Sequence, residues 1–266
     1  MYIVICQKNL CIENIHNTVS EILELNTYDN LELISVHIPK CGGTTFWNIL
    51  AHIYGERLTH ITDISKLNDG SIDKDILGVH GHYRFNPEWL NIYPNAKVCT
   101  WIRHPIDRLI SHYVYIATFK GIPAGDKMFL DFRGNAWNIF EFAERVNNIF
   151  SYIEDISLDD IDFIGDVSSY SSDLLKLASI MNWTHPITKN YRIFNQGKYS
   201  QKIYGKKLKI KMSDRKELAR ILRRDIERYE YIKNYKDFTS NYWRYAKCKE
   251  KREWDKIVRE KSYLPS

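Results

Sequence analysis

A lysine followed closely by two glycines makes the stretch HIPKCGGTTF, residues 37–46, a place where an anion could bind. The lysine supplies a mobile positive charge, the glycines allow a tight turn that brings backbone N–H groups close to a ligand, and the threonines add hydroxyl donors. The lysine precedes the glycines, whereas it follows them in the phosphate loop GxxxxGK[ST]. The residues that could contact the anion are Lys40, Cys41, Gly42, Gly43, Thr44 and Thr45.

A second group of polar residues occurs in AKVCTWIRHPIDRLISHYVYI, residues 96–116. Arg103 comes directly after the apolar run 98–102, and the carboxyl ends of strands are where open α/β sheets bind ligands. Its guanidinium can bind a phosphate through two parallel N–H bonds. Ser111 reaches the same phosphate only if that group lies along the following helix. Taken alone, Arg103 could equally form a structural salt bridge and Ser111 could be a surface residue.

The first group lies between a predicted strand and a predicted helix. Residues 31–38 are a short apolar run rich in residues that favour strands, and from Phe46 onward apolar residues recur at helical spacing. The hydroxyl of Thr44 or Thr45 would suit the N-cap of this helix, and Gly55 would mark its end. The free N–H groups at the helix start would then point at the same anion as the lysine.

The second group has the same order of strand, loop and helix, because Pro105 and Asp107 fit the first turn of a helix. Strands followed by helices recur along the 266 residues. This pattern predicts one α/β domain over residues 1–266, with a mainly parallel sheet of about five strands flanked by helices and a P-loop-like first loop. The expected core residues are Leu33, Ile34, Val36, Phe46, Leu50, Val98, Trp101 and Leu109.

The composition argues against several other classes of protein. The net charge of +5 includes the runs KKLKIK (206–211) and KCKEKR (247–252), which are either a solvated face or a surface for an anionic partner. No zinc finger, RNP-type aromatic motif or helix-turn-helix supports nucleic-acid binding. Five scattered cysteines predict free thiols and no metal site. The apolar stretch 2–6 is too short for a signal peptide or a membrane span, which predicts a cytoplasmic protein.

PKCGGTTF together with RHPIDRLISHY resembles the two cofactor signatures of sulfotransferases that use 3'-phosphoadenosine 5'-phosphosulfate, PAPS. The resemblance is closest to the branch that contains the heparan sulfate 2-O- and 6-O-sulfotransferases and small bacterial relatives. It implies that Arg103 and Ser111 hold the 3'-phosphate. Cys41 replaces the more usual threonine or serine, and a thiol beside a bound anion could have a lowered pKa. The residues that the resemblance assigns to the 5'-phosphosulfate are Lys40, Gly42, Gly43, Thr44 and Thr45.

GVHGHYRF, residues 78–85, resembles the H-G-H stretch of the uronosyl 2-O-sulfotransferases. The resemblance assigns the catalytic base to His82, with His80 as a companion that orients it or contacts the acceptor. An imidazole suits this role, since its ordinary pKa of about 6.5 lets it accept a hydroxyl proton near neutral pH. We expect His37 to be a buried strand histidine satisfied by hydrogen bonding. His104, next to the arginine, could touch the cofactor.

The resemblance is strong over residues 31–116 and weaker over 161–232, where a late strand and helix and a closing helix are similar to those of the family. Residues 233–266 are expected to extend that closing helix, or to close over the acceptor.

These motifs predict transfer of the sulfuryl group from PAPS to a hydroxyl of a small metabolite or natural-product intermediate, with 3',5'-adenosine bisphosphate (PAP) as the other product. The lysine-rich C-terminal third keeps an anionic glycan acceptor as an alternative. A phosphoryl-transfer enzyme would need GxxxxGK[ST] and an acidic magnesium ligand after a later strand. A non-catalytic binding protein would not need His80 and His82. We expect no nucleic-acid or membrane partner, and the sequence leaves the oligomeric state open.

Overall fold

The computed structural model describes residues 30–61, 63–119, 127–146, 148–154, 157–183, 202–203 and 206–246. Five parallel strands form its central sheet in the spatial order β2-β3-β1-β4-β5. The expected α/β class, with a parallel sheet of five strands flanked by helices, is therefore confirmed. The strands are β1 (Leu33–Val36), β2 (Leu58–His60), β3 (Gly78–Gly81), β4 (Lys97–Ile102) and β5 (Phe163–Asp166).

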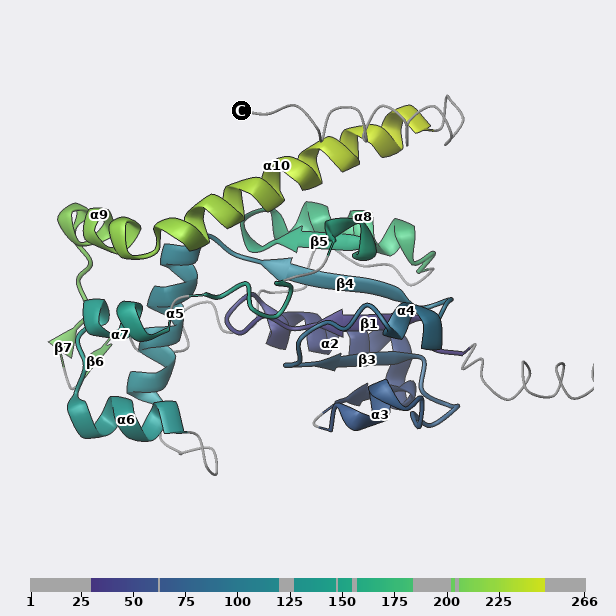
Figure 1. Ribbon diagram of the computed structural model, residues 1–266, viewed down its shortest axis with the longest axis horizontal. Coiled ribbons are helices and arrows are strands. Elements are labelled where there is room, and N and C mark those ends of the chain that lie inside the picture. Colours follow the sequence, from purple (N-terminus) through teal and green to yellow (C-terminus); the bar gives the residue numbers. More distant parts are fainter. Residues whose placement is uncertain are drawn as a thin grey trace, which may run out of the picture.

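Helices follow most of the strands (Figure 1). In Figure 1 the long α10 runs above α8 and β5, while α5 stands at the side of the sheet where β4 ends and is joined there by α6, α7 and α9. The helices are α2 (Gly43–Tyr54), α3 (Ser65–Asn68), α4 (Trp89–Ile92), α5 (Pro105–Thr118), α6 (Lys127–Asn135), α7 (Ile139–Arg145), α8 (Tyr170–Ile180), α9 (Met212–Ile221) and α10 (Arg223–Ala246).

Short elements complete the description. A small antiparallel pair joins β6 (Lys202–Ile203) to β7 (Lys206–Lys207). Single 3-10 turns occur at Gly55–Arg57, Leu158–Asp160 and Val167–Ser169.

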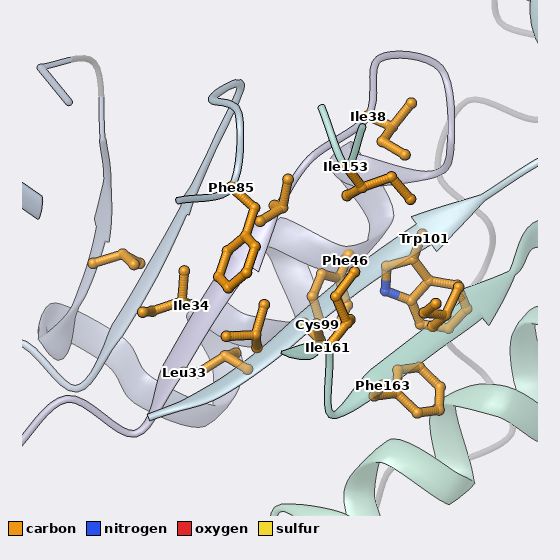
Figure 2. Packing of buried hydrophobic residues seen from close by; sticks show 14 of the residues in the cluster. Leu33, Ile34, Ile38, Phe46, Phe85, Cys99, Trp101, Ile153, Ile161 and Phe163 are labelled. Atoms are coloured by element: carbon orange, nitrogen blue, oxygen red, sulfur yellow. The ribbon is translucent and has the colours of Figure 1, made fainter. Parts of the chain in front are cut away.

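The buried core explains why the strands could be recognised in the sequence. Every residue of β1, β3 and β5 is buried, as expected for strands of a parallel sheet covered on both faces. Figure 2 shows Trp101 of β4 near Phe46 of α2 and Phe163 of β5, with ring centroids 5.5 and 5.8 Å from the indole. All the residues expected in the core are buried: Leu33, Ile34, Val36, Phe46, Leu50, Val98, Trp101 and Leu109.

The buried residues form two clusters, one around the sheet and one between α5, α6, α7 and α9. Leu109 belongs to the second cluster, because it lies on α5. The expected closing helix, residues 220–232, is divided at Leu222, where α9 ends and α10 follows. The helix α10 continues to Ala246, and the rest of the expected extension, with the run KCKEKR, lies outside the described residues. The organisation of residues 1–266 as one domain stays a prediction.

The parallel register brings the ends of the strands together at one edge of the sheet. Val36, the last residue of β1, pairs with Gly81, the last residue of β3, and Ile102 of β4 pairs with Asp166 of β5. The residues that follow these strands are therefore neighbours in space although they are far apart in the chain. The two loops with the lysine and arginine motifs follow β1 and β4, and therefore lie at this edge.

Candidate anion-binding and catalytic site

The loop between β1 and α2 turns sharply because two of its residues have a left-handed backbone: φ is 70° at Lys40 and 82° at Gly42. The helix α2 begins at Gly43 with Gly42 as its N-cap, and no side chain of the described residues caps it. The expected N-cap role of Thr44 or Thr45 is therefore wrong, since both residues already lie within the first turn. Helix geometry leaves the first N–H groups without intrahelical acceptors, so the loop presents donors to an anion.

The two glycines are required by neighbouring side chains as well as by the backbone. A Cβ on Gly43 would lie 1.8 Å from Nε2 of His37, so the imidazole occupies the space that any side chain would need. A Cβ on Gly42 would lie 3.1 Å from the ring of Tyr170, at a φ that favours glycine. Each glycine of the loop is thus packed against an aromatic ring.

Lys40 extends from this loop toward α5. Its ammonium lies over the ring of Tyr115, 4.0 Å from the centroid, in a cation–π contact. Burial, together with the positive charges of Arg103 and Arg108, lowers the pKa of Lys40 to about 8. A bound anion would oppose these effects and favour the charged ammonium.

Arg103 links the second motif to the first. It follows β4, and its Nη1 donates a hydrogen bond to the carbonyl of Lys40 at 3.3 Å. Ser111 is half-buried on α5, one turn before Tyr115. The structure therefore brings the loop residues and Arg103 together at one site, with Ser111 on the adjoining helix.

Arg108 is a residue of this site that the sequence did not reveal. It is 4% exposed, and its Nε donates a hydrogen bond to the carbonyl of Pro39 at 3.1 Å. Its Nη1 is buried without a hydrogen-bond partner among the described residues. Burial lowers the pKa of this guanidinium, which still carries its charge at neutral pH. The only signal in the sequence was its position in RHPIDR, five residues after Arg103.

Other buried polar atoms near this loop also lack partners. Most buried polar groups in proteins are hydrogen-bonded, so a group of exceptions fits a site that binds a polar ligand. His37 packs on Gly43, Tyr170 packs on Gly42 and Arg108 bonds to the loop backbone. The atoms without partners in the described part of the chain are His37 Nε2, Trp101 Nε1, His104 Nδ1, Arg108 Nη1, His112 Nδ1 and Tyr170 Oη.

His82 lies at the surface just after β3. Its Nδ1 donates a hydrogen bond to the carbonyl of His37 at 3.0 Å. Because a carbonyl oxygen only accepts, the proton of neutral His82 is held on Nδ1 and the lone pair is on Nε2. The ring of His37 stacks on that of His82 with centroids 4.2 Å apart. Desolvation by these neighbours lowers the pKa of His82, and the bond to the carbonyl only partly offsets it. Nε2 is therefore a base that is unprotonated at neutral pH.

His80 is buried within β3, with 3% exposure. Its Nδ1 is hydrogen-bonded to Oγ of Ser35 at 2.8 Å, and burial lowers the pKa to about 3. Its ring centroid lies 4.9 Å from that of His37. Two roles were expected for His80. Contact with the acceptor does not fit its burial, whereas orienting His82 through the ring of His37, on which both histidines stack, does fit.

His37 differs from its expected role. It lies one residue beyond β1 and is only half-buried, and its Nε2 has no hydrogen-bond partner among the described residues. The expectation of a strand histidine satisfied by hydrogen bonding is therefore wrong. His104 contacts Tyr229 edge to face, with centroids 5.4 Å apart, and its role toward the cofactor stays a prediction.

The pKa of Cys41 is raised, so the expectation of a lowered pKa is wrong. The residue is 1% exposed, and burial raises the pKa of its thiol to about 12, because desolvation outweighs the nearby charges of Arg108 and Arg103. Cys41 and Cys99 are both free thiols, as the sequence predicted.

Comparison with known proteins identifies the family. Residues 24–232 match the sequence model of the sulfotransferase family. The chain belongs to this family. Two solved structures are similar at low identity. A sulfotransferase from Alicyclobacillus acidocaldarius shares 14% identity with a TM-score of 0.41, over 77% of this chain and 95% of that one. Mouse sulfotransferase SULT7A1 complexed with PAP shares 16% identity with a TM-score of 0.34, over 72% of this chain and 63% of the mouse chain. No curated protein sequence matches.

A cavity of about 350 Å³ opens beside His82 in this sulfotransferase. It is lined by residues that follow β2 and β3, and β3 lies between β2 and β1 in the sheet. His82 therefore lies between the cavity and the loop that carries Lys40. The lining residues are Ile61, Ile64, His82, Tyr83 and Arg84.

The described residues contain neither a cluster of metal-binding side chains nor a membrane-spanning helix. No group of three or more histidine, cysteine or acidic side chains in this part of the sulfotransferase is arranged to hold a metal ion. Within the same residues, no helix has both the length and the apolar character needed to cross a bilayer.

Proposed function

We propose that this sulfotransferase uses PAPS to sulfate a hydroxyl group of a small molecule. The observation that carries the proposal is the hydrogen bond from Arg103 to the carbonyl of Lys40, because it joins the two motifs into one anion-binding site. In this proposal Arg103 and Ser111 bind the 3'-phosphate. The residues that bind the 5'-phosphosulfate are Lys40, Cys41 through its backbone, Gly42, Gly43, Thr44 and Thr45.

The residues present fit such a ligand. The loop supplies helix N–H donors and a lysine, and the buried Arg108 has an Nη1 with no partner among the described residues. PAPS, when bound, supplies an activated sulfuryl group. Lys40 stabilises the charge that develops on the departing 5'-phosphate oxygen, as positioned donors do in other transfer enzymes.

His82 acts as the base of the proposed reaction. Its Nε2 accepts the proton of the acceptor hydroxyl, while Nδ1 keeps its proton in the bond to the His37 carbonyl. His80 is a positioning residue in this scheme, since it stacks on His37 and is itself anchored by Ser35. The anionic glycan acceptor and the cytoplasmic location stay predictions, and the cavity volume of about 350 Å³ favours a small acceptor.

Thermal unfolding with and without PAP tests the cofactor. A ligand that binds only the folded state raises its melting temperature by mass action. Arg103→Ala should weaken PAP binding by roughly 1.5–3 kcal/mol, the range for a hydrogen bond to a charged group. Arg57→Ala, at an exposed arginine beyond the far end of α2, is the matched control and should bind PAP as the wild type does. No PAP-induced shift in the wild type would refute the proposal.

A further inference from the structure

The cavity beside His82 has a composition that restricts which acceptor it can take. One wall is apolar and consists of Ile61 and Ile64, which follow β2. The rest of the lining comes from the segment after β3 and consists of His82, Tyr83 and Arg84. Among the described residues, no acidic side chain lines the cavity, and Arg84 is its one residue with a permanent charge.

The spacing of His82 and Arg84 is fixed by the buried residues between and after them. His82 and Arg84 are exposed, whereas Tyr83 and Phe85 are buried, so exposed and buried side chains alternate along this segment. The hydroxyl of Tyr83 donates to the carbonyl of Ser35 at 3.0 Å, and the N–H of Phe85 donates to the carbonyl of Tyr152 at 2.9 Å. The backbone positions that carry the base and the guanidinium are therefore held in place, two residues apart in the chain.

The charge of Arg84 is not neutralised by a neighbour in the described part of the chain, where it forms no salt bridge. Asp63 lies in the chain between two of the lining residues, Ile61 and Ile64. Its carboxylate accepts hydrogen bonds from the N–H and hydroxyl of Ser65, at 3.1 and 2.7 Å, and so is engaged within its own turn. A ligand in the cavity would therefore meet a positive charge at one end.

We infer that this cavity is the acceptor site and that it selects a small hydroxylated organic anion, in which a short apolar body separates the hydroxyl from the anionic group. The hydroxyl lies at Nε2 of His82, the anionic group binds Arg84 and the apolar body lies against Ile61 and Ile64. This inference rests on the proposed function. In the reaction an S–O bond forms to the acceptor, the S–O bond to the 5'-phosphate breaks and the hydroxyl proton goes to His82. The products are a sulfate monoester and PAP.

Matched acceptor pairs test the inference. Hydroxybenzoates and short hydroxyalkanoates are assayed with PAPS beside their methyl esters, which keep the hydroxyl and the body but lack the charge. The wild type should prefer each acid by roughly 10-fold to 150-fold in kcat/KM, the equivalent of one hydrogen bond between charged groups. Arg84→Gln should reduce that preference to within about 3-fold, whereas the control Arg57→Gln should keep it. A sulfonate analogue with the same body distinguishes a requirement for a carboxylate from a requirement for any anion.

Binding of the same pairs to the sulfotransferase–PAP complex, measured by saturation-transfer NMR, gives a readout that does not depend on turnover. Equal binding and equal kcat/KM for acids and esters would overturn the inference, as would an acid preference that survives in Arg84→Gln. Failure to bind any acid of the panel would overturn it as well. The thermal unfolding experiment with PAP separates the two failures. If the acids fail but PAP still raises the melting temperature, the proposed function stays intact. If PAP does not raise the melting temperature, the proposed function itself is wrong.

Discussion

Gly43→Ala tests whether the imidazole of His37 is the reason for the second glycine in the loop between β1 and α2. A Cβ at this position would lie 1.8, 1.9 and 2.4 Å from Nε2, Cε1 and Cδ2 of His37. Ordinary carbon contacts are about 3.5–4.0 Å, so the ring would have to move by roughly 1.5 Å or more. The backbone cannot yield instead, because Gly43 is the first residue of α2 and its helix packs on the sheet.

The expected cost follows from what the displaced ring loses. His37 would leave its stacks on His82 and His80, and overpacking of this kind costs about 1–3 kcal/mol. For a chain of this size, about 1 kcal/mol lowers the melting temperature by roughly 2–4 °C. Gly43→Ala should therefore melt roughly 2–12 °C below the wild type.

Urea and thermal unfolding of a double-mutant cycle measure this cost. Removing the ring in His37→Ala removes the clash, so Gly43→Ala should cost much less in that background. Gly134→Ala is the control, since a Cβ at this exposed glycine of α6 meets nothing within 4 Å and should be neutral or stabilising by up to about 1 kcal/mol. Additive costs of Gly43→Ala and His37→Ala would show that the ring is not the reason for the glycine.

Two further predictions concern the proposed chemistry, and a third concerns the burial of Cys41. His82→Ala should lower turnover by roughly 100-fold or more while PAP still raises the melting temperature, and unchanged turnover would remove the residue from the mechanism. The pH profile of kcat/KM should be bell-shaped. Its acid limb lies below pH 6.5, because the pKa of His82 is lowered, and its alkaline limb lies near pH 8, where Lys40 loses its proton. Lys40→Arg should move the alkaline limb to higher pH and leave the acid limb where it is. Cys41 should resist iodoacetamide at pH 8 in the folded chain and react in denaturant, as peptide mass mapping can show.

The elements that carry the site could be predicted because their sequence patterns are local. The strand before Lys40 is apolar except for Ser35 and buried throughout, as expected for a strand of a covered parallel sheet, and α5 begins at Pro105 with Asp107 in its first turn. Gly55 ends α2 as expected. Local patterns could not decide the cap of α2, because the left-handed backbone of Gly42 places the N-cap two or three residues nearer the N-terminus than Thr44 or Thr45.

Side-chain roles that depend on burial could not be predicted in the same way. Cys41 was expected to respond to a nearby anion, but its pKa is governed by the depth at which the loop buries it. Arg108 was not distinguished from a surface helix residue, because only the tertiary structure shows that it reaches the carbonyl of Pro39. In both cases the decisive contact is with a segment that is remote in sequence or with the packed core.

The position of the proposed base depends on strand register in a way that the motifs alone do not show. His37 and His82 are 45 residues apart, but Val36 and Gly81 pair at the ends of β1 and β3, so the next residue of each strand meets the other. A slip of one residue would turn every side chain of a strand to the opposite face. The same register places the cavity beside His82, His82 itself, the Lys40 loop and Arg103 in the order of the strands β2, β3, β1 and β4. In-line transfer needs the acceptor hydroxyl close to both the base and the sulfuryl group. In the proposed reaction, this order would bring all three to one edge of the sheet.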